Sequence, residues 1–233
     1  MPAFASKGHL TRSFNKLGDL LLTFGKQNKK PHAEQKATND YEQAVLEPAH
    51  VQKLQDPPKR PPTPTTNTVE KVVRDKNEVI WVLAEDGTPI SAEAILGKDF
   101  GGSKRSSVEA KAQARAGGDA RLDTDQGGHI IGHRFMGDQG TKNLFPQNAN
   151  LNRSAYKTME NEWADWIDEG FEIRLKVELD PPGAARPDNI DVFYEVYDPE
   201  INRKVFDREH EFQNQTNEGF DRISKKDMYK YRN

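Results

Sequence analysis

The chain has 233 residues, of which 34% are hydrophobic and 30% charged, with a net charge of −3 and no cysteine. Disulfide bonds and thiolate metal sites are therefore excluded, and so is a protein that binds polyanions over its whole surface. A mean hydropathy of −0.92 favours one ordinary domain with a polar extension over a single core spanning the chain.

Neither a membrane segment nor a signal peptide is predicted. No run approaches the roughly 18 apolar residues that span a bilayer, so we expect no membrane partner. The opening MPAFASKGHL lacks a charged leader followed by a long apolar core. Export of this protein would need a different signal, or one in a partner or a longer parent chain.

Residues 1–55 form the first predicted region. Within LTRSFNKLGDLLLTFGKQN (10–28), apolar residues recur at helical spacing and predict an amphipathic helix. That helix either folds back on the domain or docks a partner such as a secretion carrier. DPPKRPPTPTTNT (56–68) predicts an extended, proline-rich linker, and residues 69–233 are the expected folded domain.

The folded region opens with EVIWVLAEDGTPISAEAIL (78–96), which predicts two strands joined by a turn at Asp86-Gly87. A basic segment, SKRSSVEAKAQAR (103–115), follows. It is either a solvated face or a surface for a phosphate backbone. Its cations, set against the single acid Glu109, are Lys104, Arg105, Lys111 and Arg115.

The clearest element is a helix over 152–169 that ends at Gly170. Its predicted core face comprises Tyr156, Met159, Trp163, Trp166 and Ile167. Strict alternation then predicts a strand over 171–179, with strands at 190–198 and, at the edge, 203–215. The lysine-rich tail is expected to fray. This order of strands and helices predicts a mixed α+β domain.

DTDQGGHIIGHRF (123–135) places a glycine-framed histidine in the middle of the domain. Gly127 and Gly128 permit a backbone conformation and a close approach that side chains would block. An imidazole with its usual pKa near 6.5 takes a proton from water at neutral pH, which makes His129 a candidate base. The alternative is a core histidine with satisfied hydrogen bonds. His133 would suit zinc only if both histidines were helical, which the glycines disfavour.

NLFPQNANLNRSAYKTMENEW (143–163) supplies neutral amides. Asn152, at the predicted start of the helix, offers a carbonyl oxygen of the kind Mg²⁺ prefers. Glu160, eight residues on, lies about 80° around the helix, so both side chains can face one cleft. Asn152 could instead only cap the helix, and we expect Asn148 and Asn150 to be turn or cap residues.

Together, DQGGHIIGHRF and NLFPQNANLNRSAYKTMENEW resemble the bacterial branch of the DNA/RNA non-specific endonucleases. These are ββα-metal nucleases, common as toxin domains of bacterial competition systems. The resemblance covers about 78–214, including RPDNIDVFYEV, and leaves 1–68 aside. It implies an α+β fold with a ββα-metal core and a mixed antiparallel sheet, preceded by a helical or disordered N-terminal region.

The resemblance also implies roles. His129 matches the general base, Asn152 the ligand of the divalent metal (Mg²⁺, with Mn²⁺ as alternative), Glu160 the acid that orients a metal-bound water, and Asn143 a supporting asparagine of the catalytic site. The better-known branch has Asp-Arg-Gly-His, whereas Gly127 stands here in place of the arginine. Arg134 is then the first candidate for the cation on the phosphate and Lys142 the second, although Arg134 could equally be a structural ion-pair partner.

The resulting prediction is a metal-dependent endonuclease for DNA and RNA, delivered as a secreted or injected antibacterial toxin that acts in the target-cell cytoplasm. It implies an immunity protein, which we expect to be acidic and to cover the basic cleft. Two alternatives stay open at this point. One is a nucleic-acid-binding module that has lost the chemistry, and the other is a docking part of a secretion apparatus acting through residues 1–55.

Overall fold

The computed structural model describes residues 67–232. The helix predicted within 1–55, and the linker up to residue 66, lie outside the described residues. The first strand of the described residues begins at Thr68, one residue before the predicted domain start. Within 67–232 no helix has both the length and the apolar character needed to cross a bilayer.

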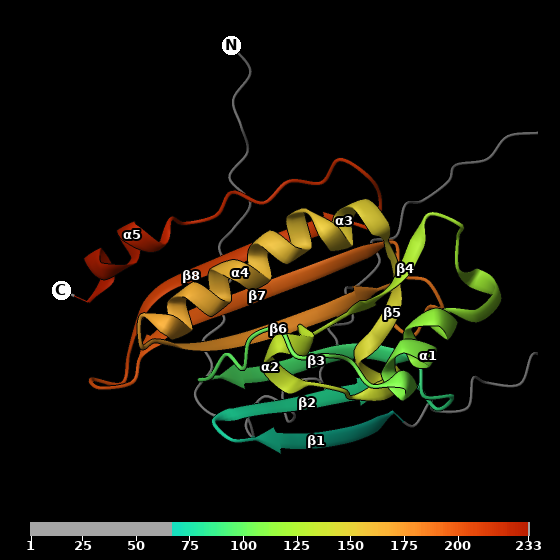
Figure 1. Cartoon of the computed structure of the whole chain (residues 1–233), viewed down its shortest axis with the longest axis horizontal. Helices are drawn as coiled ribbons and strands as arrows, with labels where there is room; N and C mark the ends of the chain where they lie inside the picture. The colour runs from blue at the N-terminus through green and yellow to red at the C-terminus, as the bar shows by residue number, and fades with distance from the viewer. Residues whose placement is uncertain (1–66, 233) are drawn as a thin grey trace, which may run out of the picture. The chain divides into compact units, whose positions relative to one another are not determined.

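A six-stranded antiparallel sheet forms the base of the domain (Figure 1). The hairpin predicted over 78–96 turns at the predicted place, where Gly87 adopts φ +84°. The last strand lies at the sheet edge, as predicted. In spatial order the strands are β1 (Thr68–Arg74), β2 (Asn77–Leu83), β3 (Pro89–Leu96), β6 (Glu172–Asp180), β7 (Asn189–Asp198) and β8 (Arg203–Gln213).

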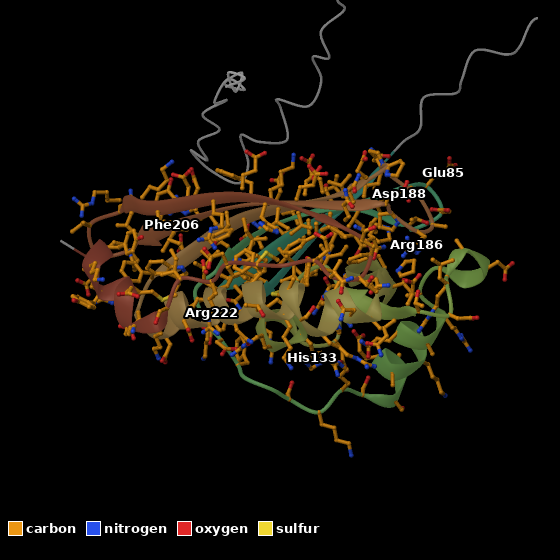
Figure 2. The ribbon with its side chains drawn as sticks, turned by 90° about the horizontal axis from the view of Figure 1, so that it is seen from above. Glu85, His133, Arg186, Asp188, Phe206 and Arg222 are labelled. Carbon is orange, nitrogen blue, oxygen red and sulfur yellow. The ribbon has the colours of Figure 1, made fainter. Side chains whose placement is uncertain are left out.

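Alternation along the strands decides which face of the sheet carries the core. In β6 every second residue, from Ile173 through Leu175 and Val177 to Leu179, is at most 2% exposed. The charged residues between them point to the opposite face. Figure 2 shows the consequence as two layers, with the helices and His133 on one side of the sheet.

The predicted helix over 152–169 is in fact two helices, so that prediction was wrong in its bounds. α3 (Ala149–Arg153) and α4 (Ala155–Asp168) meet at Ser154, whose φ of −114° and ψ of −95° are not helical. The predicted core face holds, since Tyr156, Met159, Trp163 and Trp166 are each at most 1% exposed. Gly170, with φ +86°, follows the end of α4 as expected.

The histidine and asparagine segments pair as a second, two-stranded sheet. β4 (Asp125–His129) runs antiparallel to β5 (Leu144–Asn148), with His129 opposite Leu144. Between them lie α2 (His133–Met136) and the 3₁₀ helix η3 (Gly140–Asn143). Because α3 and α4 follow β5 directly, the chain forms a ββα unit beside the large sheet (Figure 1), which confirms the predicted α+β class.

The C-terminal tail is ordered up to residue 232, contrary to the expected fraying. α5 (Lys225–Met228) and a 3₁₀ turn (Tyr229–Tyr231) pack against α4. Met228 is fully buried, and the ring of Tyr231 meets that of Trp166 edge-on at 5.3 Å. Burial of these apolar groups outweighs the lysine-rich composition that suggested a frayed end.

Candidate active site

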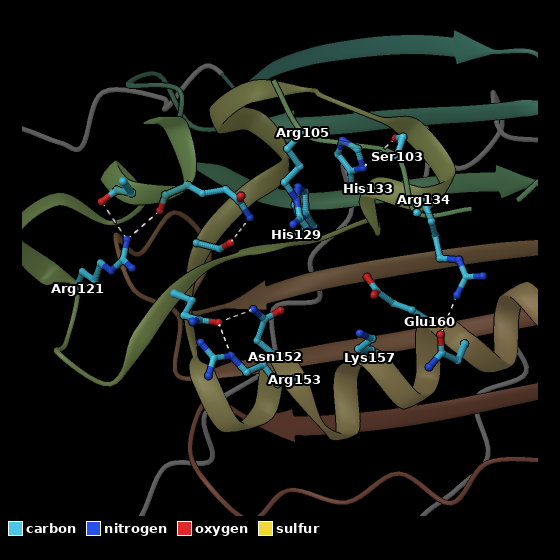
Figure 3. A pocket seen from close by; sticks show the side chains of 16 residues that line it. Ser103, Arg105, Arg121, His129, His133, Arg134, Asn152, Arg153, Lys157 and Glu160 are labelled. Atoms are coloured by element: carbon cyan, nitrogen blue, oxygen red, sulfur yellow. Dashed lines mark hydrogen bonds between the residues drawn. The ribbon is translucent and has the colours of Figure 1, made fainter. Parts of the chain in front are cut away.

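A cleft of about 750 Å³ opens between β4, the loop before α1 (Ser107–Arg115) and the helices α3 and α4 (Figure 3). His129 reaches it from one side, and Asn152, Lys157 and Glu160 reach it from the other. Its lining is polar and charged almost throughout. The remaining lining residues are Gly102, Ser103, Arg105, Gln113, Ala114, Arg121, Gln126, Gly127, His133, Arg134, Arg153 and Asn161.

The paired glycines let other elements pack closely against β4. A Cβ at Gly127 would overlap the backbone of Gln113 on α1, coming within 2.6 Å of its Cα. A Cβ at Gly128 would overlap the side chain of Gln147 on β5. Neither glycine has a positive φ. Of the two predicted reasons for these glycines, close approach is therefore the one the structure supports.

His129 ends β4 and is 7% exposed. Its Nε2 lies 2.9 Å from Oε1 of Glu109, a side chain that is only 1% exposed. Burial lowers the pKa of the imidazole, and the Glu109 carboxylate opposes that shift. The ring is therefore neutral at neutral pH, which is the form a general base needs. Ile130 and Ile131, fully buried, anchor the strand end as predicted.

His133 does not form a zinc site with His129. Its Nε2 bonds Asp138 Oδ1 at 2.8 Å, and the two imidazole rings form a T-shaped pair with centroids 5.8 Å apart. His129 ends a strand and His133 begins α2, so the two do not share a helix. Within the part of the chain that the structure describes, no cluster of three histidine or acidic ligands is present.

Asn152 is not the helix cap. Asn148 caps α3, because its side chain accepts from the N–H groups of Asn150 and Leu151, which confirms the cap role expected for Asn148. Asn152, the fourth residue of α3, donates through Nδ2 to Gln126 Oε1 at 3.3 Å. Arg153 donates to the same oxygen at 3.1 Å.

The orientation of the Asn152 amide follows from these contacts. A guanidinium only donates, so Gln126 presents its oxygen to Arg153 and hence to Asn152 as well. The Asn152 NH₂ group must face Gln126, and its Oδ1 faces the other way. Asn152 itself lines the cleft, so a neutral oxygen donor is available there.

Glu160 supplies the acidic oxygens of the cleft. Gly132 packs against the carboxylate, since a Cβ there would lie 2.6 Å from Glu160 Oε1. Burial raises the pKa of Glu160 to about 7, opposed by the charges of Arg134, Lys157 and Arg105. The Glu160 oxygens accept no hydrogen bond from residues 67–232. Their lone pairs are therefore free for a cation or a water.

These donors fit a hard, hydrated divalent ion. Mg²⁺ keeps several waters and needs only one or two protein oxygens, which Asn152 and Glu160 supply. Both residues line one cleft, as predicted, although the single helix behind that prediction is broken at Ser154. A closed structural zinc site would need four protein ligands, twice the two oxygen ligands that Asn152 and Glu160 offer here.

Asn143, predicted as a supporting asparagine of the catalytic site, does not itself line the cleft. The side chain is fully buried. Its Oδ1 accepts from the Ile131 N–H at 2.9 Å and its Nδ2 donates to the Ile131 carbonyl at 2.8 Å. Asn143 therefore holds the backbone just after His129, which is a supporting role.

The two cations predicted to reach the phosphate are both engaged elsewhere. Arg134 lines the cleft but donates to Asp99 through Nε at 2.9 Å and through Nη2 at 2.5 Å, and to Asn161 at 2.7 Å. Arg134 is thus an ion-pair partner of Asp99 that also lines the cleft, and its contact with a phosphate stays a prediction. Lys142 lies outside the cleft, bonded to Glu70 at 2.9 Å and placed over the ring of Trp81. The prediction for Lys142 was wrong.

Two other cations in the cleft have no such partner among the described residues. Arg105 lies beside His129 (Figure 3) and makes no hydrogen bond or ion pair among residues 67–232, and neither does Lys157. The predicted nucleic-acid contacts divide accordingly. Arg105 lines the cleft, whereas Lys104 and Lys111 are exposed outside it and Arg115 lines a separate hollow.

Three residues of the site were not predicted from the sequence. Arg121 lines the cleft and donates to the last carbonyls of α1 at Gln113 and Ala114. Gln126 orients Asn152. Glu109 was seen only as an acid among cations, although Ser106-x-x-Glu109 is a helix-start pattern, and the Glu109 N–H does donate to Ser106 Oγ. That pattern predicts the helix but not the contact with His129.

A buried neutral imidazole, two oxygen donors and free cations share one polar cleft. This arrangement defines a hydrolytic site for an anionic substrate, not a pocket for an apolar ligand. A family model described as DNA/RNA non-specific endonuclease matches residues 67–197, more than half of the chain. The chain therefore belongs to the DNA/RNA non-specific endonuclease family.

Individual relatives are similar over shorter stretches. The type VII secretion system protein EssD of Staphylococcus aureus is 31% identical over 104 residues, which are 42% of this chain and 17% of EssD. The probable deoxyribonuclease RhsA of Dickeya dadantii is 33% identical over 86 residues, which are 36% of this chain and 6% of RhsA. The chain thus matches less than a fifth of the length of either relative.

Among solved structures, NucA from Streptococcus agalactiae with no metal bound gives a TM-score of 0.44 at 13% identity, covering 66% of this chain and 73% of NucA. NucA with a magnesium ion bound gives a TM-score of 0.42 at 11% identity, covering 66% and 74%.

Proposed function

We propose that this chain is a metal-dependent endonuclease that hydrolyses phosphodiester bonds of DNA and RNA. The observation that carries the proposal is the convergence of His129, Asn152 and Glu160 on one cleft. Family membership supports the same chemistry. Asn152 and Glu160 would hold the ion, Mg²⁺ or Mn²⁺, whose charge stabilises the phosphate under attack.

His129 begins the reaction by taking a proton from water through the ring nitrogen that Glu109 does not occupy. The oxygen of that water attacks phosphorus in line, a new P–O bond forms, and the bond to the 3′ oxygen breaks. The leaving oxygen takes a proton from solvent, and the products carry 5′-phosphate ends. Arg105 and Lys157, free of ion pairs among residues 67–232, balance the charge on the phosphate.

The lining of the cleft accounts for a lack of sequence preference. It holds no Phe, Tyr or Trp, and its one aliphatic side chain is Ala114. The guanidinium and ammonium groups that line it suit phosphates, which every nucleic acid carries. Binding through phosphates positions a nucleic acid without reading its bases.

The deciding measurement is degradation of plasmid DNA and of RNA with Mg²⁺, compared between the wild-type chain and His129→Ala. Cleavage by the wild type alone, abolished by EDTA, is the expected result. His210→Ala is the matched control, because His210 lies on β8 and not in the cleft. Full activity of His129→Ala would remove His129 as the base. Salt-sensitive binding without cleavage under any divalent metal would instead favour a binding module.

We further propose that the chain is a secreted or injected antibacterial toxin effector acting in the target-cell cytoplasm, with a cognate immunity protein as its partner. The similarity to two relatives, a secretion-system protein and a probable deoxyribonuclease, supports this. Residues 1–55 would bind a secretion carrier. Induced expression in a bacterium should degrade the chromosome, unlike His129→Ala. Co-expression of the neighbouring open reading frame should rescue growth, and failure of every neighbour to do so would count against the toxin role.

A further inference from the structure

Glu109 makes two contacts from a site closed to solvent. One oxygen, Oε1, lies 2.9 Å from Nε2 of His129. The other, Oε2, accepts from the backbone N–H of Gly140 at 3.1 Å. At 1% exposure, a carboxylate in this position must have both oxygens satisfied by the protein.

The first contact determines which nitrogen of His129 carries the proton. Oε2 of Glu109 accepts from a backbone N–H, and Oε1 has the same role toward His129 when Nε2 carries the ring proton. In the neutral ring the lone pair is then on Nδ1. A base whose other nitrogen bonds a carboxylate is held in one tautomer and one orientation.

The glycine at position 127 is what allows this contact. Glu109 and Gln113 are four residues apart on α1 and therefore lie on one face of the helix. The Gln113 backbone sits where a Cβ of residue 127 would be, and its side chain donates to the Gly127 carbonyl at 2.9 Å. A side chain at 127 would push α1, and Glu109 with it, away from His129.

We propose that Glu109 is the positioning residue of the nuclease site, fixing His129 as the Nε2–H tautomer so that Nδ1 receives the proton from water. The inference rests on the proposed function for its catalytic consequence. It also explains the glycine at 127, where the better-known branch has an arginine. In this chain that position makes room for the helix that carries the carboxylate.

The tautomer is measured directly, without any activity. Histidine labelled with ¹⁵N, in the full chain at about pH 8 where the ring is neutral, should show His129 with a protonated Nε2 and an unprotonated Nδ1. In Glu109→Gln the amide can also donate, so a mixture of tautomers or a reversed one is expected. A protonated Nδ1 in the wild type would overturn the proposal, even in an active nuclease. The expected tautomer in a chain without nuclease activity would overturn the proposed function alone.

Kinetics test whether Glu109 acts through His129. Glu109→Gln should lower kcat about 100-fold with little change in KM, as expected when a general base is misplaced. In a His129→Ala background the same change should cost nothing further. Ser106→Ala is the control, since it removes the α1 cap contact and leaves the carboxylate in place. Equal losses from Glu109→Gln in both backgrounds, or an equal loss from Ser106→Ala, would show that Glu109 only stabilises α1.

Discussion

Gly132 lies directly against the carboxylate of Glu160, with no room for a methyl group between them. A Cβ at position 132 would come within 2.6 Å of Oε1 and 2.9 Å of Cδ. Gly132 precedes α2 with φ −48° and ψ 137°, a conformation open to alanine. The position therefore requires glycine for space and not for backbone freedom.

Gly132→Ala should lower nuclease activity with a much smaller effect on folding. The methyl group displaces the Glu160 carboxylate, and misplacement by about 1 Å costs on the order of 100-fold in rate. kcat and the thermal midpoint are the two measurements. Gly219→Ala is the control, because nothing lies within 4 Å of a Cβ there. Wild-type kcat in Gly132→Ala would mean that the position of Glu160 is unimportant.

Gln126→Ala should weaken the binding of Mg²⁺ more than it lowers the cleavage rate at saturating Mg²⁺. Without the Gln126 oxygen, the Asn152 amide is no longer held with Oδ1 toward the cleft. Loss of such an orienting contact typically costs about 10- to 100-fold in metal affinity. The measurement is the Mg²⁺ concentration for half-maximal cleavage, with the exposed Gln215→Ala as control. An unchanged Mg²⁺ dependence would refute the orienting role.

Three cation variants should behave differently. Arg105→Ala should lower kcat about 100-fold, the typical cost of losing a group that stabilises transition-state charge. Lys142→Ala should leave cleavage unchanged, since Lys142 contacts Glu70 and Trp81 outside the cleft.

Arg134→Ala should chiefly lower stability, because Asp99 loses its bidentate partner. Single-turnover rates and urea unfolding separate these effects, and a large kcat loss in Lys142→Ala would contradict the assignment.

Stability should fall as pH rises through about 7 because of Glu93. This side chain is 3% exposed, its Oε2 accepts no hydrogen bond within residues 67–232, and burial raises its pKa from 4.5 to about 7. A raised carboxyl pKa favours the folded state fully below about 4.5, and this advantage is lost as pH passes 7.

At alkaline pH the free energy of unfolding of Glu93→Gln should therefore exceed that of the wild type by about 2 kcal/mol, after allowance for solvent screening. Urea unfolding measures this difference. The difference between the two proteins should shrink toward pH 5. The exposed Glu85→Gln is the control and should follow the wild type throughout. Parallel pH profiles for wild type and Glu93→Gln would rule out Glu93 as the source of the dependence.

Local patterns were sufficient to predict five of the six strands of the main sheet and the apolar face of α4, but not the first strand, β1. Alternation from Phe171 to Leu179 and helical spacing from Tyr156 to Trp166 depend only on which neighbours must be buried together. They did not predict the break at Ser154 or the ordered tail. The ordered tail depends on packing between distant segments, such as Tyr231 on Trp166.

The sequence by itself predicted, through motif order and the family resemblance, that His129, Asn152 and Glu160 belong to one site, and all three line the same cleft. Only the tertiary structure decided their partners. Twenty residues separate Glu109 from His129 and 26 separate Gln126 from Asn152, and Arg134 is held by Asp99, 35 residues before it. Charge and hydrogen bonding act over a few ångströms in space, and no local pattern records which distant residue the fold brings that close.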